Sequence, residues 1–258
     1  MTETKLKAAL YLEAVLGALP LLAAHDPALA SALAGPDVTV ALFTGGLGAR
    51  LIVKAGQVSV IIASPQPGDL RLWFPSAAQL VRAFDNSGPA LALPLGGWTQ
   101  LKVARRLPAA GKKMEALLND RATALNDPAR LRLHVWAGFV VGVAAAASWL
   151  RHQPEGAAER ARLGESVATF SCPEFPVSLW LSPADATWGW GEPPRPVGVA
   201  ITFATLAVAL AELDHRLDSL AALGLGDLRI TGKLPLADQL GVIMLRAGNL
   251  LRPPAVHP

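Results

Sequence analysis

The 258-residue sequence has little cysteine, tyrosine and charge. Its single cysteine, Cys172, excludes an intramolecular disulfide framework and a cysteine-rich metal site, and such sparing use of cysteine fits a reducing cytoplasm, where we expect this protein. Charged residues make up 17% of the chain and hydrophobic residues 52%, a balance that excludes disorder and allows a sizeable core. The net charge of +3 is mild and the basic residues do not cluster with aromatics, so we expect no nucleic-acid partner.

Two long apolar stretches raise the question of a membrane. The N-terminus, MTETKLKAALYLEAVLGALPLLAAHDP, resembles a signal peptide, but Glu3 and Glu13 interrupt its charge pattern, so we expect a mature amphipathic helix instead. Residues 133–150, LHVWAGFVVGVAAAASWL, reach the lower length limit of a bilayer span. They are rich in Ala and Gly and include His134, which favours a buried core helix, with a true span as the alternative.

The sequence contains an internal echo. LKVARRLP begins at Leu101 and LRITGKLP at Leu228, and 228 − 101 = 127 residues separate them. The same offset joins further pairs, if slips of one to three residues are allowed in the stretches between them: His25-Asp26-Pro27 with His152-Gln153-Pro154, Phe43 with Phe170, Gly97 with Gly224, and Leu107-Pro108 with Leu234-Pro235. A register held over this distance predicts a duplication, with a first half at residues 1–126 and a second at 127–258.

Each half follows the same order of elements. In the first half, the pattern predicts a helix over 5–24, broken or kinked at Pro20, strands at VTVALF, ARLIVK, QVSVIIAS and DLRLWF, a helix at SAAQLVRAF, a strand at LKV and a closing helix over 107–119. The second half repeats this with a helix over 131–150, strands at ESVATFS, FPVSLWLS, ATWGWG and VGVAITF, a helix at ATLAVALAELDHRL, the strand DLRITG and a closing helix. Residues 152–165 are polar and predict an exposed connection. Segregated strands and helices favour an α+β fold with mainly antiparallel sheets.

The second half resembles the sterol carrier protein 2 (SCP2) family from Val167 to Leu250. The nearest local similarity is LAALGLGDLRITGKLPLADQLGVIML, residues 220–245, a glycine-bearing strand followed by a Leu-rich helix. The first half matches more loosely, with Trp98 before its strand and Arg105 where the second half has Gly232. The resemblance implies two fused SCP2-like halves, each a mainly antiparallel sheet covered by helices.

The resemblance also implies a function, namely non-catalytic binding or carrying of a lipid or another hydrophobic small molecule in an apolar cavity. Fatty-acyl, sterol-like and isoprenoid chains are the expected ligand classes, and contact with a membrane surface or a protein partner stays open. Two alternatives remain: a structural or protein-interaction module, and an accessory subunit that presents an apolar substrate to a separate enzyme.

The residues themselves suggest no catalytic, metal or cofactor site. Asp214-His215 with Asp218 has a spacing that metal sites use, but we interpret it as a solvated polar face of a helix. Cys172 has no flanking nucleophile signature. Gly45-Gly46-Leu47-Gly48 lies between two strands and lacks the spacing of a phosphate loop, so it predicts a hairpin turn.

Seven tryptophans beside one tyrosine are the most informative class of residue. Trp188 and Trp190 alternate on one predicted strand, so both rings face one side, as core filling or as a pocket wall. Because Gly232 stands where the first half has Arg105, we expect the second half to be the ligand binder. Its expected lining is Trp180, Trp188, Trp190, Phe203, Leu240, Ile243 and Met244, the last three forming one helical stripe.

Overall fold

The computed structural model describes residues 1–251, and these form two compact units. Unit 1 comprises Met1–Ala116 with residues 248–251, and unit 2 comprises Leu117–Ala247. The predicted boundary between residues 126 and 127 lies just before the longest helix of unit 2.

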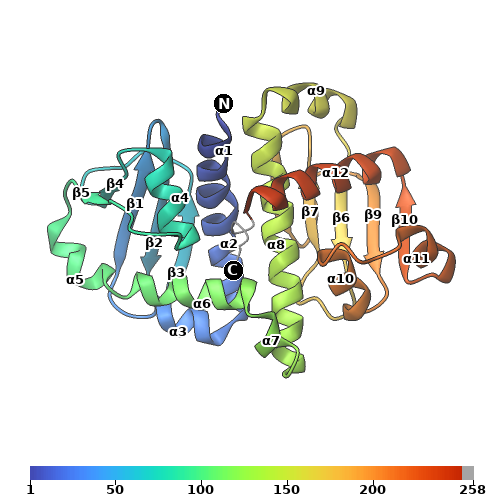
Figure 1. Cartoon of the computed structure of the whole chain (residues 1–258), viewed down its shortest axis with the longest axis horizontal. Coiled ribbons are helices and arrows are strands. Elements are labelled where there is room, and N and C mark those ends of the chain that lie inside the picture. The colour runs from blue at the N-terminus through green and yellow to red at the C-terminus, as the bar shows by residue number, and fades with distance from the viewer. Residues whose placement is uncertain (252–258) are drawn as a thin grey trace. The chain divides into compact units, whose positions relative to one another are not determined.

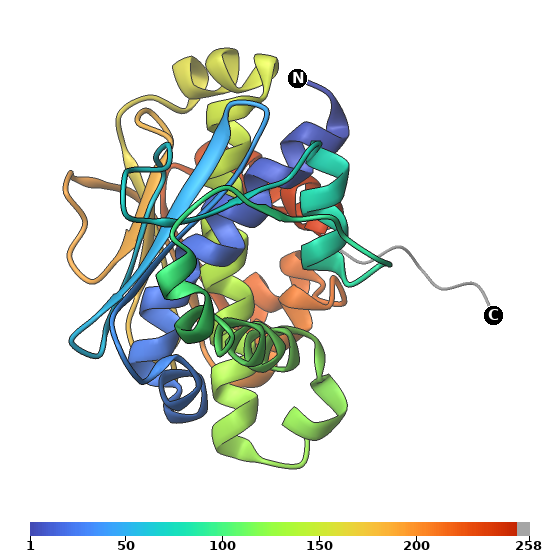
Figure 2. The same cartoon turned by 90° about the vertical axis from the view of Figure 1, so that its left-hand side faces the viewer.

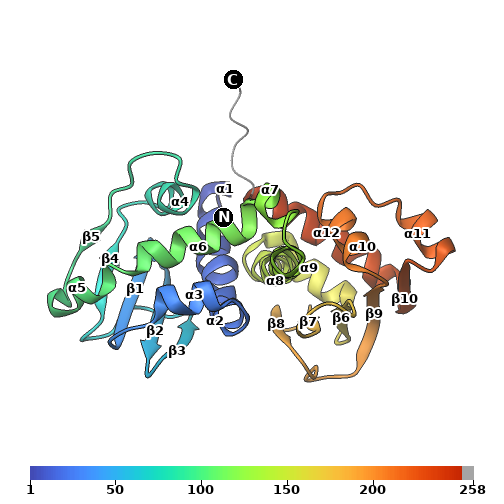
Figure 3. The same ribbon diagram turned by 90° about the horizontal axis from the view of Figure 1, so that it is seen from below.

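Unit 1 holds one five-stranded sheet, sheet A, with helices on one side of it (Figure 3). Its elements are α1 (Glu3–Leu10), the π-helix η1 (Tyr11–Val15), α2 (Leu16–His25), α3 (Pro27–Leu33), β1 (Val38–Thr44), β2 (Leu47–Lys54), β3 (Gln57–Ile61), β4 (Leu70–Trp73), α4 (Ala77–Asp85), β5 (Leu93–Pro94), the 3₁₀ turn η2 (Trp98–Gln100), α5 (Leu101–Ala104) and α6 (Leu107–Asn119), whose last turn belongs to unit 2.

Unit 2 holds a second five-stranded sheet, sheet B, also covered by helices on one side (Figure 3). Its elements are α7 (Arg121–Ala124), α8 (Pro128–His152), α9 (Pro154–Leu163), β6 (Val167–Ser171), β7 (Leu179–Ser182), β8 (Thr187–Trp190), β9 (Val197–Phe203), α10 (Leu206–Leu213), α11 (Ser219–Leu225), β10 (Leu228–Gly232) and α12 (Leu234–Leu251). The polar stretch 152–165, predicted as a connection, contains α9, which begins at Pro154 in the position that proline tolerates best.

The two sheets have the same topology, which confirms the α+β fold and the two similar halves (Figure 1). Sheet A has the order β3-β2-β1-β4-β5 and sheet B the order β10-β9-β6-β7-β8. In each, the first strand of the unit is central, its next strand pairs antiparallel with it, and the fourth strand pairs parallel on its other side. The crossover helices α4 and α10 are both capped by a hydroxyl, Ser76 in one and Thr205 in the other.

The prediction of a strand at LKV, made from the repeated sequence, is wrong. Leu101–Ala104 forms helix α5, and the strand of sheet A that occupies the position of β10 is the short β5. The closing helices do keep the offset, since α6 begins at Leu107 and α12 at Leu234, and 234 − 107 = 127. Unit 2 has the extra helix α11 before its fifth strand, and unit 1 has η2 and α5 after its own, so two insertions of similar length cancel in the register.

This correction also removes two predicted equivalences. Gly97 precedes η2 whereas Gly224 lies inside α11, and Arg105 ends α5 whereas Gly232 ends β10. The comparison of Arg105 with Gly232 therefore no longer favours the second half as the ligand binder.

Phe43 and Phe170 correspond only after a slip. In β1, Phe43 lies opposite Gly48 and Trp73, on the face away from the buried Val40. In β6, Phe170 is buried and lies opposite Leu179. The two rings therefore lie on opposite faces of their sheets, so the structural correspondence of β1 and β6 differs from the offset of 127 by an odd number of residues, because side chains alternate along a strand.

The face that carries Val40, Leu51 and Leu70 is called the inner face of sheet A, and the face that carries Arg50 and Arg71 its outer face. Helix α2 packs on β3 (Figure 2).

The first helix continues through Pro20, and its irregularity is the π-helix η1 rather than a break at the proline.

Both apolar stretches of the sequence are helices with most of their length buried. Glu3–His25 and Pro128–His152 are long and apolar enough to cross a membrane by length and composition alone, a test that core helices also pass. The predicted core helix over 133–150 lies inside the second of them.

The hairpin turn predicted at Gly45-Gly46 is confirmed, and a second hairpin turn follows it in the same sheet. Gly45 and Gly46 join β1 to β2, and Ala55 and Gly56 join β2 to β3. All four residues have positive φ, as two-residue turns that match strand twist require. The Gly-rich stretch is therefore a turn and not a phosphate cradle.

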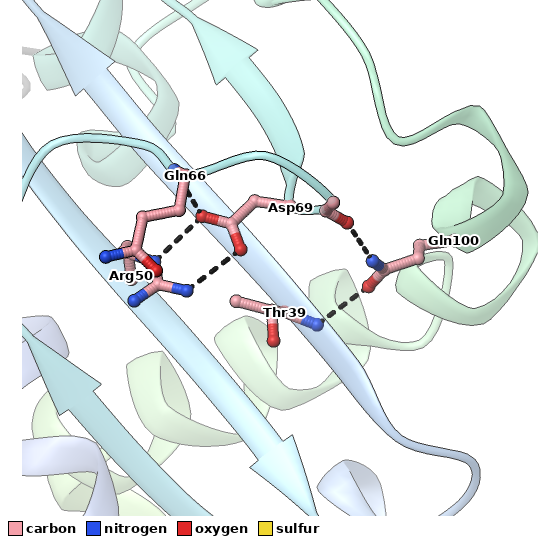
Figure 4. A network of polar contacts seen from close by, with 6 residues as sticks. Thr39, Arg50, Gln66, Asp69 and Gln100 are labelled. Atoms are coloured by element: carbon pink, nitrogen blue, oxygen red, sulfur yellow. Dashed lines mark hydrogen bonds and ion pairs between the residues drawn. The ribbon is translucent and has the colours of Figure 1, made fainter.

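A polar network fastens the loop between β3 and β4 to sheet A (Figure 4). Arg50 Nε and Nη2 donate to the two carboxylate oxygens of Asp69 at 2.8 and 3.0 Å, and the backbone N–H of Gln66 donates to Asp69 at 2.8 Å. Gln100 accepts from the backbone N–H of Thr39 at 2.8 Å and donates to the carbonyl of Gly68. Four segments far apart in sequence are thereby fixed to one another.

Candidate functional site

The inner face of sheet B is a continuous apolar and aromatic surface. One cross-strand row runs through all five strands, since Trp190 pairs with Leu179, Leu179 with Phe170, Phe170 with Ile201 and Ile201 with Ile230. No charged side chain stands on this face in the described strands. Its residues are Ala168, Phe170, Leu179, Leu181, Trp188, Trp190, Val199, Ile201, Phe203, Leu228 and Ile230.

Helix α8 covers this face with an aromatic cluster, on a segment that the sequence predicted only as a buried core helix. The ring of Phe139 lies 4.9 Å from that of Phe203 and 5.4 Å from that of Phe175, measured between centroids. Trp136 Nε1 donates to the carbonyl of Val177 at 3.2 Å, which satisfies its one polar atom in a buried position. The signal was present, because Trp136 and Phe139 stand three residues apart on one face of a helix.

Helices α10 and α12 pack on α8 at two glycines. A Cβ at Gly138 would lie 2.8 Å from Leu213 Cδ1 of α10, and one at Gly142 would lie 3.4 Å from Met244 Cε of α12. Glycines four residues apart form a notch that lets neighbouring helices approach.

Two of the three residues of the predicted stripe on α12 lie in the interior of unit 2. Leu240 and Ile243 are buried, and Met244 is half-buried against α8. Phe203 is buried too, beside Leu228 of β10.

The three predicted tryptophans do not share one wall. Trp188 and Trp190 do face the same side of β8, with centroids 6.1 Å apart, and 49% of Trp190 is exposed. Trp180 lies opposite Gly189 on the outer face of sheet B, where a Cβ on Gly189 would lie 2.4 Å from its indole. Trp180 Nε1 donates to the carbonyl of Trp190 at 3.2 Å, so it supports the edge strand from outside.

Cys172 is buried and its thiol donates to Glu174 at 3.2 Å. Burial above all, and the neighbouring Glu174 carboxylate, raise the pKa of Cys172 to about 11. At neutral pH the sulfur is therefore a protonated thiol, which is a poor nucleophile.

The Asp214-His215-Asp218 constellation is occupied by structural contacts. Arg121 and Arg216 both pair with the carboxylate of Asp214, and Asp218 caps the N-terminus of α11. Burial raises the pKa of the nearby Glu212, an effect that His215 partly offsets. Within residues 1–251, no group of three or more His, Cys, Asp or Glu side chains could hold a metal ion.

The fold and this site define a protein of two α+β units, one of which has an aromatic, uncharged sheet face under its helices. The solved structures to which the chain is similar include SCP2 proteins. No protein-family description and no curated protein matches the sequence.

Three of the similar structures show the extent of the similarity in sequence identity, TM-score and coverage. A UbiJ-SCP2 ubiquinone synthesis protein has 21% identity and a TM-score of 0.32, over 40% of this chain and 84% of its own. Sterol carrier protein 2 from Yarrowia lipolytica, in its apo form, has 15% identity and a TM-score of 0.34, over 43% and 91%. The palmitated SCP2L2 protein from Aedes aegypti has 20% identity and a TM-score of 0.26, over 35% and 93%.

Proposed function

We propose that unit 2 binds a lipid or another hydrophobic small molecule against the inner face of sheet B, without catalysing a reaction, in the cytoplasm. The observation that carries the proposal is the cross-strand row from Trp190 to Ile230. The row begins at a ring that is 49% exposed and passes at once to Leu179 and Phe170, which are almost fully buried. An apolar chain could thus leave water at Trp190 and continue along uncharged side chains.

The chemistry of this face favours an apolar ligand of flexible shape. Burial of each methylene contributes about 0.8 kcal/mol, without the directional demands of hydrogen bonding. Fatty-acyl and isoprenoid chains suit a row of side chains, whereas a charged metabolite would lose its hydration there without a partner. Unit 1 has the same topology, but its inner face carries Val40, Leu51 and Leu70 in place of rings.

The first experiment is mass spectrometry of an organic extract of the purified full chain, followed by titration with a fluorescent fatty acid. A stoichiometric lipid, or saturable binding of the fatty acid, supports the proposal. Clean extracts together with no fatty-acid binding would overturn it in favour of an interaction module.

A pair of tryptophan variants locates the site. Trp190→Ser removes the exposed ring of the row and should weaken fatty-acid binding by roughly tenfold, which corresponds to the partial burial of one aromatic ring. Trp98→Ser is the matched control, because Trp98 is an exposed tryptophan of unit 1, with 61% of its surface accessible. Equal losses in both variants would show that the row in unit 2 is not the binding surface.

A further inference from the structure

One edge strand of sheet A, β3, lacks the features by which edge strands usually avoid pairing with another chain. β3 is the outermost strand on its side of the sheet (Figure 3). The stretch from Ala55 to Gly68, which contains β3 and the loop after it, has no Lys, Arg, Asp or Glu. Gln57, Ser59 and Ile61 are exposed, and the strand has neither a proline nor a bulge.

The backbone of β3 presents free hydrogen-bonding groups at this edge. A two-residue turn joins β2 to β3, so the closing pair of Lys54 and Gln57 is hydrogen-bonded, and every second pair after it is hydrogen-bonded as well. Ser59 therefore directs its N–H and C=O toward β2, whereas Val58 and Val60 direct theirs away from it. Within residues 1–251, no backbone carbonyl accepts from the N–H of Val58 or Val60.

The other three edge strands of the two sheets are protected. β5 has two residues, and one of them is Pro94, which has no N–H to donate. β10 carries the exposed Arg229, and α11 packs beside it. β8 has four residues, and the carbonyl of Trp190 on it already accepts from the indole of Trp180. Among the described strands, β3 is therefore the edge that is open to pairing.

We propose that β3 pairs antiparallel with β3 of a second copy of this chain, about a two-fold axis at Ser59. The N–H and C=O of Val58 then meet those of Val60 in the second copy, and the reverse, which gives four hydrogen bonds. Ser59 faces its own equivalent, and Gln57 faces Ile61. No like charges meet, because the whole edge is neutral.

The side chains favour a second copy over an unrelated strand. Val58 lies opposite Val53 and Val60 opposite Leu51, so both valines belong to the inner face of sheet A. Pairing Val58 with Val60 across the axis extends this apolar face with side chains of the same shape. A neutral edge also has no charge by which to select an acidic or a basic partner.

The assembly closes at two copies. A two-fold pairing uses the β3 edge of both chains, so neither copy keeps it free for a third. The opposite edge of each sheet is β5, which is too short and too poor in N–H donors to continue the sheet. The expected product is therefore a dimer with one continuous sheet and not a fibre.

A cysteine at the axis tests the register. In a Cys172→Ser background, Ser59→Cys should form a disulfide-linked dimer on mild oxidation, because facing residues of a non-hydrogen-bonded pair have Cα atoms about 4.5 Å apart. Gln57→Cys is the matched control, since it is exposed on the same face of the same strand. Its equivalent would lie roughly 14 Å away, four residues along the strand, so it should remain uncrosslinked.

Sedimentation velocity of the full chain at rising concentration tests the dimer itself. Ser59→Lys places like charges opposite each other and should weaken dimerisation by roughly fivefold. Val60→Pro removes an outward N–H without breaking the ladder to β2, so it should abolish the dimer. Thr187→Lys, on the exposed start of β8, should leave dimerisation unchanged.

Far-ultraviolet circular dichroism checks that each variant is folded. A wild type that stays monomeric at its highest soluble concentration would overturn the proposal. So would equal crosslinking of Ser59→Cys and Gln57→Cys, or a dimer that persists in folded Val60→Pro. The inference does not depend on ligand binding by unit 2, because it is tested through β3 and fatty-acid binding is tested through Trp190.

Discussion

Met244 of α12 packs its terminal methyl over Gly142 of α8, so that a Cβ on the glycine would lie 3.4 Å from Met244 Cε. One turn earlier, a Cβ on Gly138 would lie 2.8 Å from Leu213 Cδ1. The first distance is an ordinary van der Waals contact and the second is not. Packing therefore requires a glycine at position 138, whereas position 142 has room for a methyl group.

Gly142→Ala should stabilise unit 2 by about 0.8 kcal/mol, because alanine forms helix better than glycine and its methyl fits beside Met244. Gly138→Ala should lose this gain, since Leu213 must move to make room. Urea unfolding of the two variants measures the difference in free energy. A Gly142→Ala protein less stable than the Gly138→Ala protein would contradict the described packing of α12 on α8.

Asp69→Asn should destabilise unit 1 by about 3 kcal/mol, because it leaves the guanidinium of Arg50 buried without its anion. Burial alone would raise the pKa of Asp69, but the hydrogen bonds from Arg50 and from the backbone of Gln66 outweigh it and hold the pKa below the ordinary range. Replacing both partners, as in Arg50→Met with Asp69→Leu, should cost much less than either single change.

The lowered pKa of Asp69 also fixes a sign for the pH dependence. The stability contributed by the ionised carboxylate is fully present above its unfolded pKa of about 3.9 and is lost as pH falls through the folded value. As pH is lowered below about 4, the free energy of unfolding should thus decrease more steeply in the wild type than in Asp69→Asn. Parallel acid profiles would show that the ion pair contributes no linkage.

Ala55→Asn should stabilise unit 1 by about 1 kcal/mol, because Ala55 has φ +50, a left-handed conformation that asparagine tolerates better. Its backbone N–H donates to Asp37 at 2.9 Å, and asparagine keeps that donor. Thermal unfolding measures the gain. Ala186→Asn is the contrasting variant, since Ala186 has φ +52 but is buried, so its larger side chain should cost stability.

Local pattern was sufficient to predict most elements and the class of the fold. Alternation predicted VTVALF and VGVAITF as strands, and helical periodicity predicted SAAQLVRAF and ATLAVALAELDHRL as the crossover helices, which Ser76 and Thr205 cap in the structure. These features are short-range, because strand propensity, helix caps and turn glycines act within a few residues. The duplication was predicted from the same local patterns, because they recur at an offset of 127 residues.

The error at LKVARRLP has a physical cause. Leu101–Ala104 and Leu228–Gly232 have similar composition, yet one is a helical turn and the other an edge strand. Short apolar runs are compatible with either state, and tertiary neighbours decide between them. Insertions on opposite sides of the fifth strand restored the offset of 127, so the register itself concealed the change.

The sequence by itself determined that Trp188 and Trp190 face one side of a strand, because that follows from the two-residue period of the backbone. Only the tertiary structure decided that Trp180, on the neighbouring strand, faces the other way, since strand pairing sets which residues lie opposite. Likewise, the sequence determined that residues 133–150 form a helix apolar on nearly all sides. The tertiary structure alone decided which side meets Phe203 and which meets Met244, because long-range packing, and not local propensity, orients a helix about its axis.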